Sequence, residues 1–554
     1  MNRKTLFFLF SFFLILILGI FFRISNISPH KIYPDAYQSL LVAMNIADYH
    51  SVVGLLGNNG MLYPDFFAWS RPGFPLFILF TSLFTHDFAL AAQIVSVTAS
   101  ILSLPLAFFL GRILYKSQLS GITTILLLAF SFNHTARSGF ILTEGMSVFL
   151  MLLFVTLFFT RPLGRFSLPL SLLRGILFAL LILTRYEYSL LIIPVLYYVK
   201  VSKSYTREEI LTFLGGAFFT LLLAAFLLYP LPGTLFLFFH QTQDLLIKSV
   251  TGLGVLLALI FFLRFLPKKI AMLLTRRLPH IMLIALWFGT FYLLLQTILP
   301  LPLNNVTAGL RNFLLDDLVL SSSFLIGITL FIRRYIHRDL LTFSLLSIVM
   351  LYSVYFRTNP AMERYITHLI PFLLIPAGYG LAEVISMGSS SYRFAKTVII
   401  LMALALLFQG LTTWMGIHEW GDKSWFSISY DERAALLTSK RIVMRDSLLL
   451  ASFPEPYYYV SSLSTHSITD TYPYVYIPDA LNDKEIVISE DMGMRDIFPT
   501  FTSFLTTHMQ DRRLDTFYVH LPYHYAAYSR EETHPVTLYK TTVGELKERI
   551  QNSK

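Results

Sequence analysis

The chain has 554 residues, of which 55% are hydrophobic, 16% aromatic and only 14% charged. A single soluble core cannot bury so much apolar side chain, so the composition excludes an ordinary soluble protein and favours a bilayer protein. The formal charge of +10 does not indicate nucleic acid as a partner, because basic cytoplasmic loops account for it in a membrane protein. The absence of cysteine excludes disulfides, thiol nucleophiles and cysteine-based zinc sites.

The N-terminal residues resemble either a signal peptide or a first membrane helix. Arg3 and Lys4 precede an apolar run over 5–23. No small-residue cleavage site follows the run, and its length suits a bilayer. We therefore expect an uncleaved first helix with a cytoplasmic N-terminus.

Further apolar runs predict an all-α polytopic membrane domain over 1–416. Thirteen spans are expected, near 5–23, 88–111, 119–133, 140–160, 168–184, 187–199, 210–230, 246–263, 281–300, 318–332, 340–356, 366–388 and 397–416. With these spans, the Lys and Arg residues gather in loops on one side, as the positive-inside rule requires of the cytoplasmic side. The pattern predicts a multi-pass protein of the cell (inner or plasma) membrane.

Two other parts of the chain are predicted to lie outside the cytoplasm. The long first external loop, 24–87, contains an apolar stripe at helical spacing over 36–49 and a short apolar run over 74–84, both typical of interfacial helices. The segment 417–554 is more polar and alternates strand-like runs at 447–453, 485–489 and 516–521 with a helical pattern at 541–550. We expect a small soluble α/β domain there, in which the aromatic run 457–459 fits a buried strand better than the alternative, a sugar-stacking platform.

Asp35 follows the first span and precedes the interfacial helix. With Gln38 three residues later it fits a capping box, which is a purely structural role. A helix N-terminus also holds a carboxylate in place and ionised, so the same position suits a catalytic acid.

Glu144 lies in an apolar run at the external end of the fourth predicted span. A carboxylate there is costly unless it faces a cavity or a partner, which makes it a functional candidate. The alternative is an acid that the helix dipole favours at the start of a helix. In either case Asp35 and Glu144 are predicted on the same side of the membrane.

Three arginines, Arg71, Arg185 and Arg364, are predicted on that external side as well. Guanidinium groups pair with phosphate oxygens in a bidentate fork, so several of them opposite acids suit a buried phosphate. A lone arginine of this kind would instead snorkel at the interface. No P-loop, GxGxxG, HExxH or GxSxG motif is present, which argues against a soluble nucleotide cofactor, and the histidines are not at metal-ligand spacing.

Five short motifs follow one another along the membrane part. They are Asp35 after the first span, Arg71-Pro72, Thr143-Glu144, Thr184-Arg185 followed by Glu187, and Glu363-Arg364-Tyr365 followed by His368 and Pro371. Their order and common sidedness resemble the GT-C glycosyltransferases, in particular the branch of the protein O-mannosyltransferases and lipid A aminoarabinose transferases. The resemblance covers about 1–416 and extends in layout to 417–554.

The resemblance implies an enzyme that transfers a sugar, a hexose or a pentose, from a polyprenyl-phosphate donor to an extracytoplasmic acceptor, usually with inversion. By position, it implies catalytic roles for Asp35 and Glu144. It implies binding of the carrier phosphate by Arg71, Arg185, Arg364, Tyr365 and His368. The chain has Asp35-Ala36 where many members have two adjacent acids, so a divalent metal between Asp35 and Glu144 is left open.

Two other classes of protein fit the same composition. A polyprenyl-linked glycan polymerase or ligase would share the carrier but use a different catalytic loop. A lipid or solute transporter would also need many spans and intramembrane charges, but it would often have matched halves with interrupted helices, which we do not find here.

Overall fold

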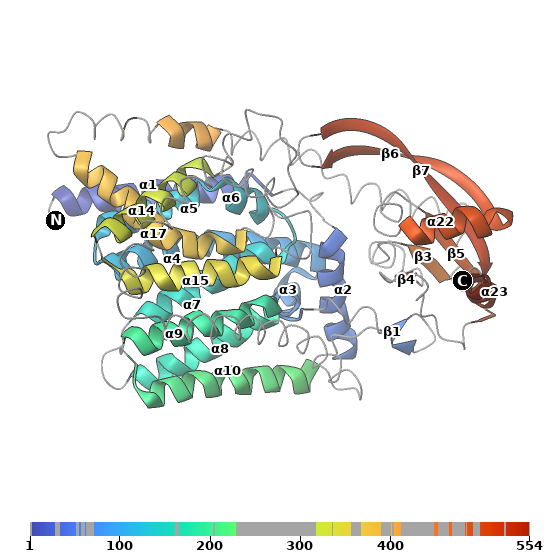
Figure 1. Cartoon of the computed structure of the whole chain (residues 1–554), viewed down its shortest axis with the longest axis horizontal. Coiled ribbons are helices and arrows are strands. Elements are labelled where there is room, and N and C mark those ends of the chain that lie inside the picture. The colour runs from blue at the N-terminus through green and yellow to red at the C-terminus, as the bar shows by residue number, and fades with distance from the viewer. Residues whose placement is uncertain are drawn as a thin grey trace, which may run out of the picture. The chain divides into compact units, whose positions relative to one another are not determined.

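A computed structural model describes the chain over residues 3–27, 34–50, 55–56, 61–62, 71–160, 166–202, 205–228, 317–334, 336–355, 367–388, 400, 404–411, 448–451, 465–467, 482–483, 485–490, 499–525 and 528–552. It divides into two compact units. The helical unit comprises Met1–Ile27 and Leu90–Glu419, and the mixed unit comprises Ser28–Ala89 and Trp420–Lys554. Figure 1 shows both.

The helical unit is built from long apolar helices. Its elements are α1 (Arg3–Ile24), α4 (Phe88–Tyr115), α5 (Gln118–Ala129), α6 (Phe132–Ser138), α7 (Thr143–Phe159), α8 (Ser167–Thr184), the 3₁₀ helix η4 (Tyr186–Leu191), α9 (Ile192–Ser202), α10 (Arg207–Leu228), α14 (Leu318–Arg334), α15 (Arg338–Tyr355), the 3₁₀ helix η5 (Thr367–Leu369) and α17 (Ile370–Gly388). Helices α7, α8, α9, α10 and α15 lie side by side in Figure 1.

Among the described residues, five helices are long and apolar enough to cross a bilayer: Thr5–Ile24, Phe88–Tyr115, Ser167–Thr184, Arg207–Leu228 and Thr367–Met387. The outward surface of the unit is apolar, with Phe7, Phe10, Phe218 and Phe226 between 65% and 75% exposed. Water does not tolerate such a surface, whereas lipid does. The chain is therefore a multi-pass membrane protein. The predicted spans 246–263 and 281–300 lie outside the described residues, and the count of thirteen stays a prediction.

The predicted span 119–133 is wrong in one detail, because the structure breaks it into α5 and α6, which are bent by 57°. The break is caused by Ser131, whose hydroxyl accepts a hydrogen bond from the backbone N–H of His134 and so starts a new helix. Hydropathy does not reveal the break, since Phe130 and Phe132 keep the local average apolar.

Small residues allow α17 to pack closely against α14 and α5. A Cβ added at Gly327 would collide with the backbone of Pro376, and one added at Gly380 would collide with the backbone of Ser323. Thr123 Oγ1 on α5 donates a 2.7 Å hydrogen bond to the carbonyl oxygen of Gly378. Close approach through glycine is typical of membrane helices, for which dispersion replaces the hydrophobic effect.

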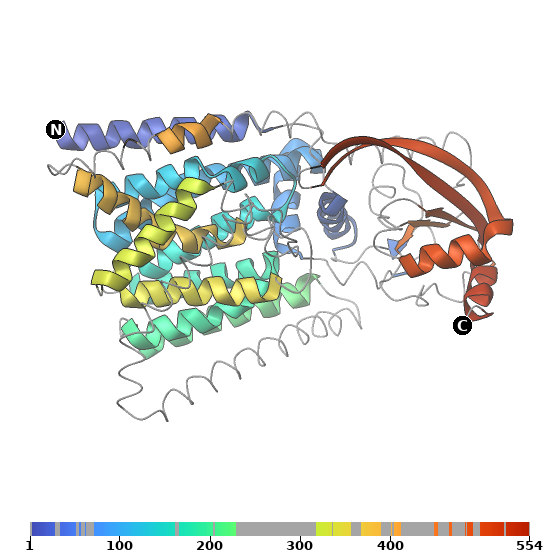
Figure 2. The same cartoon turned by 45° about the horizontal axis from the view of Figure 1, so that its top comes forward.

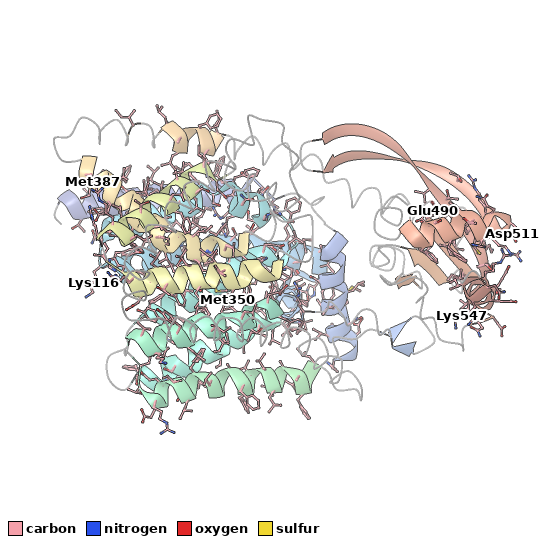
Figure 3. All side chains as sticks on the ribbon, in the orientation of Figure 1. Lys116, Met350, Met387, Glu490, Asp511 and Lys547 are labelled. Carbon is pink, nitrogen blue, oxygen red and sulfur yellow. The ribbon has the colours of Figure 1, made fainter. Side chains whose placement is uncertain are left out.

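The turn after α4 and the end of α17 lie at the same end of the helical unit. Lys116, in the turn between α4 and α5, and Met387, near the end of α17, are both at the end where α1 begins (Figure 3). Tyr115, the last residue of α4, donates a hydrogen bond to the carbonyl oxygen of Ile375 on α17.

The N-terminal part of the mixed unit contains α2 (Pro34–Tyr49), β1 (Leu55–Leu56), β2 (Met61–Leu62) and α3 (Gly73–Thr85). Helices α2 and α3 contact each other. In α2 the residues Ala36, Leu40 and Ala43 are fully buried, as the predicted apolar stripe over 36–49 requires. The short apolar run over 74–84 is α3, which ends where His86 adopts a left-handed backbone with φ 54°.

The C-terminal part of the mixed unit is a five-stranded sheet with two helices. Its elements are β3 (Leu448–Ala451), β4 (Thr465–Ser467), β5 (Glu485–Glu490), α22 (Pro499–His508), the 3₁₀ helix η7 (Gln510–Arg512), β6 (Arg513–Tyr525), β7 (Tyr528–Thr542) and α23 (Val543–Asn552). The strand order is β4-β3-β5-β7-β6. Strands β4, β3 and β5 are parallel, and β5-β7 and β7-β6 are antiparallel.

Strands β6 and β7 continue past the sheet as a curved two-stranded ribbon (Figure 2). The core of this part comprises residues of β5, β7 and both helices, among them Ile486, Ile488, Phe504, Leu505 and Leu546. The strand-like runs at 447–453, 485–489 and 516–521 coincide with β3, β5 and part of β6. The run 457–459 lies outside the described residues.

Candidate active site

Glu144 lies in the first turn of α7 and is fully buried. Leu142 precedes the helix in an extended conformation, and Ser96 Oγ on α4 donates a 3.4 Å hydrogen bond to its carbonyl oxygen. Gly145 lets α7 approach α4, because a Cβ there would already lie 3.1 Å from Ser96 O. The N-terminus of α7 therefore holds the Glu144 carboxylate inside the protein, where the helix dipole favours its ionised form.

Arg185 faces this carboxylate from the end of α8. Its backbone is extended, with φ −153° and ψ 117°, so it separates α8 from η4. Its side chain is 1% exposed, and Nη1 lies 3.8 Å from Glu144 Oε1 and 3.3 Å from Thr143 Oγ1. Nη2 lies 3.6 Å from Glu187 Oε1. One guanidinium group thus lies between two buried carboxylates.

His368 joins the group from η5, just before α17. Its Nε2 lies 2.8 Å from Arg185 Nη1, and its Nδ1 lies 2.7 Å from the hydroxyl oxygen of Tyr188. Both His368 and Tyr188 are fully buried. We call Thr143, Glu144, Arg185, Glu187, Tyr188 and His368 the buried cluster. Segments more than 180 positions apart in sequence meet in it.

Burying charges of this kind is costly, and each charge needs a partner. Arg185 is the charged partner of both Glu144 and Glu187. A carboxylate that stays ionised in a low-dielectric interior can accept a proton, and a guanidinium group can stabilise a negative charge that develops beside it. The buried cluster therefore contains the groups needed for acid–base chemistry and for anion stabilisation.

Sequence reasoning identified Glu144, Arg185 and His368 separately, and the structure brings them together. It missed Tyr188. The sequence does place a tyrosine three residues after Arg185, next to the junction between α8 and η4. Tyrosine is frequent in membrane proteins, so that signal does not distinguish this residue from the others.

Sequence reasoning also missed a second buried network, which holds α6. Arg23, near the end of α1, is fully buried and donates hydrogen bonds to Gly19 O, Leu128 O and Ser100 Oγ. Its Nη2 lies 2.7 Å from His134 Nδ1 on α6. Because arginine only donates, His134 Nδ1 accepts this bond and the proton of that ring is on Nε2.

Asp317 anchors the other end of α6. It lies just before α14 and accepts hydrogen bonds from Ser131 Oγ, from the backbone N–H groups of Phe132 and Asn133, from Asn133 Nδ2 and from Gln409 Nε2. These donors include the first N–H groups of α6, so Asp317 caps that helix from a distance of about 185 residues in sequence. The chain leaves α6 at Gly139 and reaches Glu144 five residues later. The network thus fixes the segment that leads into the buried cluster.

The other predicted site residues lie elsewhere. Helix α2 begins at Pro34, so Asp35 is in its first turn and does not precede the helix as the capping-box interpretation requires; proline favours the first helical position. The side chain of Asp35 is outside the described part. Arg71 is half-buried just before α3, in the mixed unit with Asp35. Arg364 and Tyr365 lie outside the described residues, and their roles stay predictions.

No group of three or more His, Asp or Glu side chains that could hold a metal ion occurs within the described ranges. Asp35 and Glu144 are the acids that the sequence offers for such an ion. Since the Asp35 side chain is outside those ranges, their joint use as ligands stays a prediction.

Several solved structures are similar to this chain. The oligosaccharyltransferase AglB from Archaeoglobus fulgidus, in complex with an inhibitory peptide and a dolichol-phosphate, matches 89% of this chain and 70% of its own, with a TM-score of 0.54 and 12% identity. ArnT from Cupriavidus metallidurans bound to undecaprenyl phosphate matches 97% of this chain and 98% of its own, with a TM-score of 0.52 and 12% identity. The apo state of that ArnT matches 98% and 99%, with a TM-score of 0.50 and 12% identity.

This chain has the GT-C fold. The fold that the resemblance implied is confirmed. No protein-family model and no curated protein matches the sequence. The similarity to AglB and ArnT is found in the three-dimensional structure. The match with ArnT includes nearly the whole of both chains.

Proposed function

We propose that this protein is a membrane glycosyltransferase that transfers a sugar from a polyprenyl-phosphate-linked donor to an extracytoplasmic acceptor. The observation that carries the proposal is the match of fold, over 97% of the chain, with an ArnT structure bound to undecaprenyl phosphate. The buried cluster of Glu144, Arg185 and His368 supports it independently, because a structural membrane protein has no need for such a costly group.

The proposed reaction is a single displacement at the anomeric carbon. A hydroxyl or amine of the acceptor attacks this carbon and forms the new glycosidic bond. The bond between the carbon and the carrier phosphate oxygen breaks, and polyprenyl phosphate leaves with the electron pair. A carboxylate, Asp35 or Glu144, accepts the acceptor's proton, and the single displacement inverts the configuration at the anomeric carbon. General-base assistance of this kind contributes about 10²–10⁴-fold in rate.

Arginine side chains stabilise the negative charge on the leaving phosphate in this proposal. Arg71 and Arg364 are the proposed phosphate contacts, with Tyr365 beside them. Arg185 completes the electropositive side of the site, and His368 lies beside it with Nε2 at 2.8 Å from Arg185 Nη1. Arg185 has a second role here, because it lies between Glu144 and Glu187 and favours the ionised state that a base requires. A divalent metal held by Asp35 and Glu144 is a variant of this scheme, and loss of transfer with EDTA that Mg²⁺ or Mn²⁺ restores would support it.

We infer the orientation from charge. The basic loops are proposed to be cytoplasmic. With thirteen spans, the N-terminus is then on the cytoplasmic side of the cell membrane and 417–554 is on the external side. The acceptor, whether protein, lipid or glycan, then meets the donor on the extracytoplasmic face. The domain over 417–554 binds the acceptor or covers the active face.

Two first-turn glutamates allow a matched test of the proposed base. Glu144 belongs to the buried cluster, whereas Glu209 on α10 forms a capping box with Thr206 and is buried to a similar degree. Transfer of labelled sugar from a polyprenyl-phosphate carrier is expected to fall at least about 10²-fold in Glu144→Gln and to stay close to wild type in Glu209→Gln. Equal transfer by Glu144→Gln and wild type would remove Glu144 from the mechanism, and transport of the carrier without transfer would favour the transporter.

A further inference from the structure

Tyr188 is a member of the buried cluster to which the proposed reaction assigns no role. It lies on η4, three residues after Arg185, and its ring packs against that of His368 with a centroid distance of 5.9 Å and an interplanar angle of 77°. Its hydroxyl oxygen is 2.7 Å from His368 Nδ1. Both side chains are fully buried, so water does not substitute for either group in this contact.

The contacts of His368 determine which of its nitrogens carries the proton. Arg185 Nη1 can only donate, so His368 Nε2, at 2.8 Å, accepts and carries no hydrogen. A neutral imidazole has one proton, which is then on Nδ1. The Nδ1–H group donates to the Tyr188 hydroxyl oxygen, because a hydroxyl can accept in this direction while its own proton points elsewhere.

We propose that Tyr188 is a positioning residue, which fixes the Nδ1–H tautomer of His368 and thereby holds the Arg185 guanidinium group against Glu144. This inference rests on the proposed function, since it assigns Arg185 and Glu144 to the reaction. Tyr188 itself touches neither donor nor acceptor in this account. It acts through three successive contacts: Tyr188 with His368, His368 with Arg185, and Arg185 with Glu144.

The physical reason is that each partner in this chain has only one suitable orientation. Without the Tyr188 hydroxyl, Nδ1–H is a buried donor without that acceptor, which destabilises the present tautomer. The other tautomer avoids that cost but places Nε2–H against a guanidinium N–H, so two donors face each other. Either way Arg185 is released from the position that it holds at 3.8 Å from Glu144 Oε1. A displacement of about 1 Å at a reacting group lowers turnover on the order of 10²-fold.

The variant His368→Gln provides a background in which the role of the tautomer can be tested. The amide oxygen of glutamine extends about as far as His Nε2 and accepts from arginine, and it does so without needing a proton on a second ring atom. If Tyr188 acts through the tautomer, Tyr188→Phe matters in the wild-type background and loses its effect in His368→Gln. If Tyr188 merely fills space, Tyr188→Phe has the same effect in both, because phenylalanine keeps the ring.

Tyr115→Phe is the matched control. It too removes one tyrosine hydroxyl, which is half-buried and donates to Ile375 O on α17, a residue outside the buried cluster. The four proteins of the cycle and this control are purified as full chains in detergent, and turnover is measured with a sugar-loaded polyprenyl phosphate at saturating acceptor. The thermal midpoint is recorded for each, so that a loss of fold is distinguished from a loss of turnover.

Tyr188→Phe is expected to lower turnover about 10–100-fold in the wild-type background and less than about 3-fold in His368→Gln, while Tyr115→Phe stays close to wild type. Equal effects of Tyr188→Phe in both backgrounds, or no effect in either, would overturn the positioning role and leave the proposed function intact. A wild type that transfers from no carrier would overturn the proposed function and this role with it.

Discussion

Arg23 on α1 donates a 2.7 Å hydrogen bond to Nδ1 of His134 on α6, across 111 positions of sequence. The same guanidinium group also donates to the carbonyl oxygens of Gly19 and Leu128 and to Ser100 Oγ. One buried side chain therefore ties α1 to both sides of the break between α5 and α6.

Replacing Arg23 by methionine tests this tie. The variant keeps the apolar stem but removes the Arg23 donor from His134 Nδ1 and from the Leu128 carbonyl group, which keeps its bond from the Ser131 N–H. It is expected to lower the free energy of unfolding by about 2–4 kcal/mol. Thermal unfolding in detergent measures the change. Arg112→Met is the control, because Arg112 at the other end of the bundle is exposed and its loss should leave the midpoint within about 1 °C of wild type. Equal midpoints for both variants would show that the Arg23 network does not stabilise the fold.

Asp317 provides a second test of how α6 is held. Asp317→Asn keeps the shape of the side chain but replaces one acceptor oxygen by a donor, which then opposes the N–H groups of Phe132 and Asn133 or the amide of Gln409. We expect a loss of about 2–3 kcal/mol, typical for hydrogen bonds to a buried charge, together with faster amide exchange in α6. Hydrogen–deuterium exchange of 132–138 measures it. Unchanged exchange in this segment would contradict the capping role.

The close contact between α14 and α17 predicts a strict requirement for glycine at position 327. In Gly327→Ala the added methyl group meets the backbone of Pro376, so the helices must separate, at an expected cost of about 1–3 kcal/mol. Gly215 on α10 is the matched control, since a Cβ there meets no atom within 4 Å and alanine is the better helix former. Thermal midpoints should therefore fall in Gly327→Ala and stay equal or rise in Gly215→Ala; the reverse order would contradict the observed packing.

The C-terminal part of the mixed unit should respond to acid through Asp511. Arg549 on α23 donates hydrogen bonds of 2.7 and 2.6 Å to its two oxygens and holds the pKa of this carboxyl below its ordinary value of 3.8. A carboxyl with a lowered pKa in the folded state adds stability above the ordinary pKa, and the contribution disappears as the pH falls through the lowered pKa.

Ionised Asp511 is therefore expected to stabilise α23. At pH 7, amide exchange in α23 should be faster in Asp511→Asn than in the wild type, and the two rates should converge as the pH falls below about 4. Each comparison is made at one pH, so the intrinsic pH dependence of exchange cancels. A difference that is constant from pH 7 to pH 3 would show that the ionised form of Asp511 does not stabilise α23.

The sequence predicts much of this fold because long apolar runs have few alternatives to a membrane helix. The runs over 5–23, 88–111 and 168–184 correspond closely to α1, α4 and α8. Charged residues within such runs are rare and costly, which is why Glu144 and Arg185 were identified before their contact was known. In the C-terminal part, period-two alternation located β5 but not the short strand β4 or the length of the β6–β7 ribbon.

What the sequence does not reveal depends on contacts between distant segments. The break after α5 depends on Ser131, which is local, and on Asp317, which is not. Tyr188 owes its position in the cluster to His368, 180 residues further on, and no periodicity connects the two. His134, the partner of Arg23, is 111 positions away in sequence. Hydropathy locates helices in a membrane, whereas hydrogen bonds between helices decide which polar residues form a site.

The central claim is tested most directly by transfer of radiolabelled sugar from polyprenyl-phosphate carriers, in membranes with matched amounts of wild type and Asp35→Asn. We expect transfer by the wild type and a rate of transfer at least about 10²-fold lower in the variant, with the same thermal midpoint for both proteins. Near-normal transfer by Asp35→Asn would contradict the proposed role of this acid. The absence of transfer by the wild type from every carrier would contradict the account as a whole and favour a transporter.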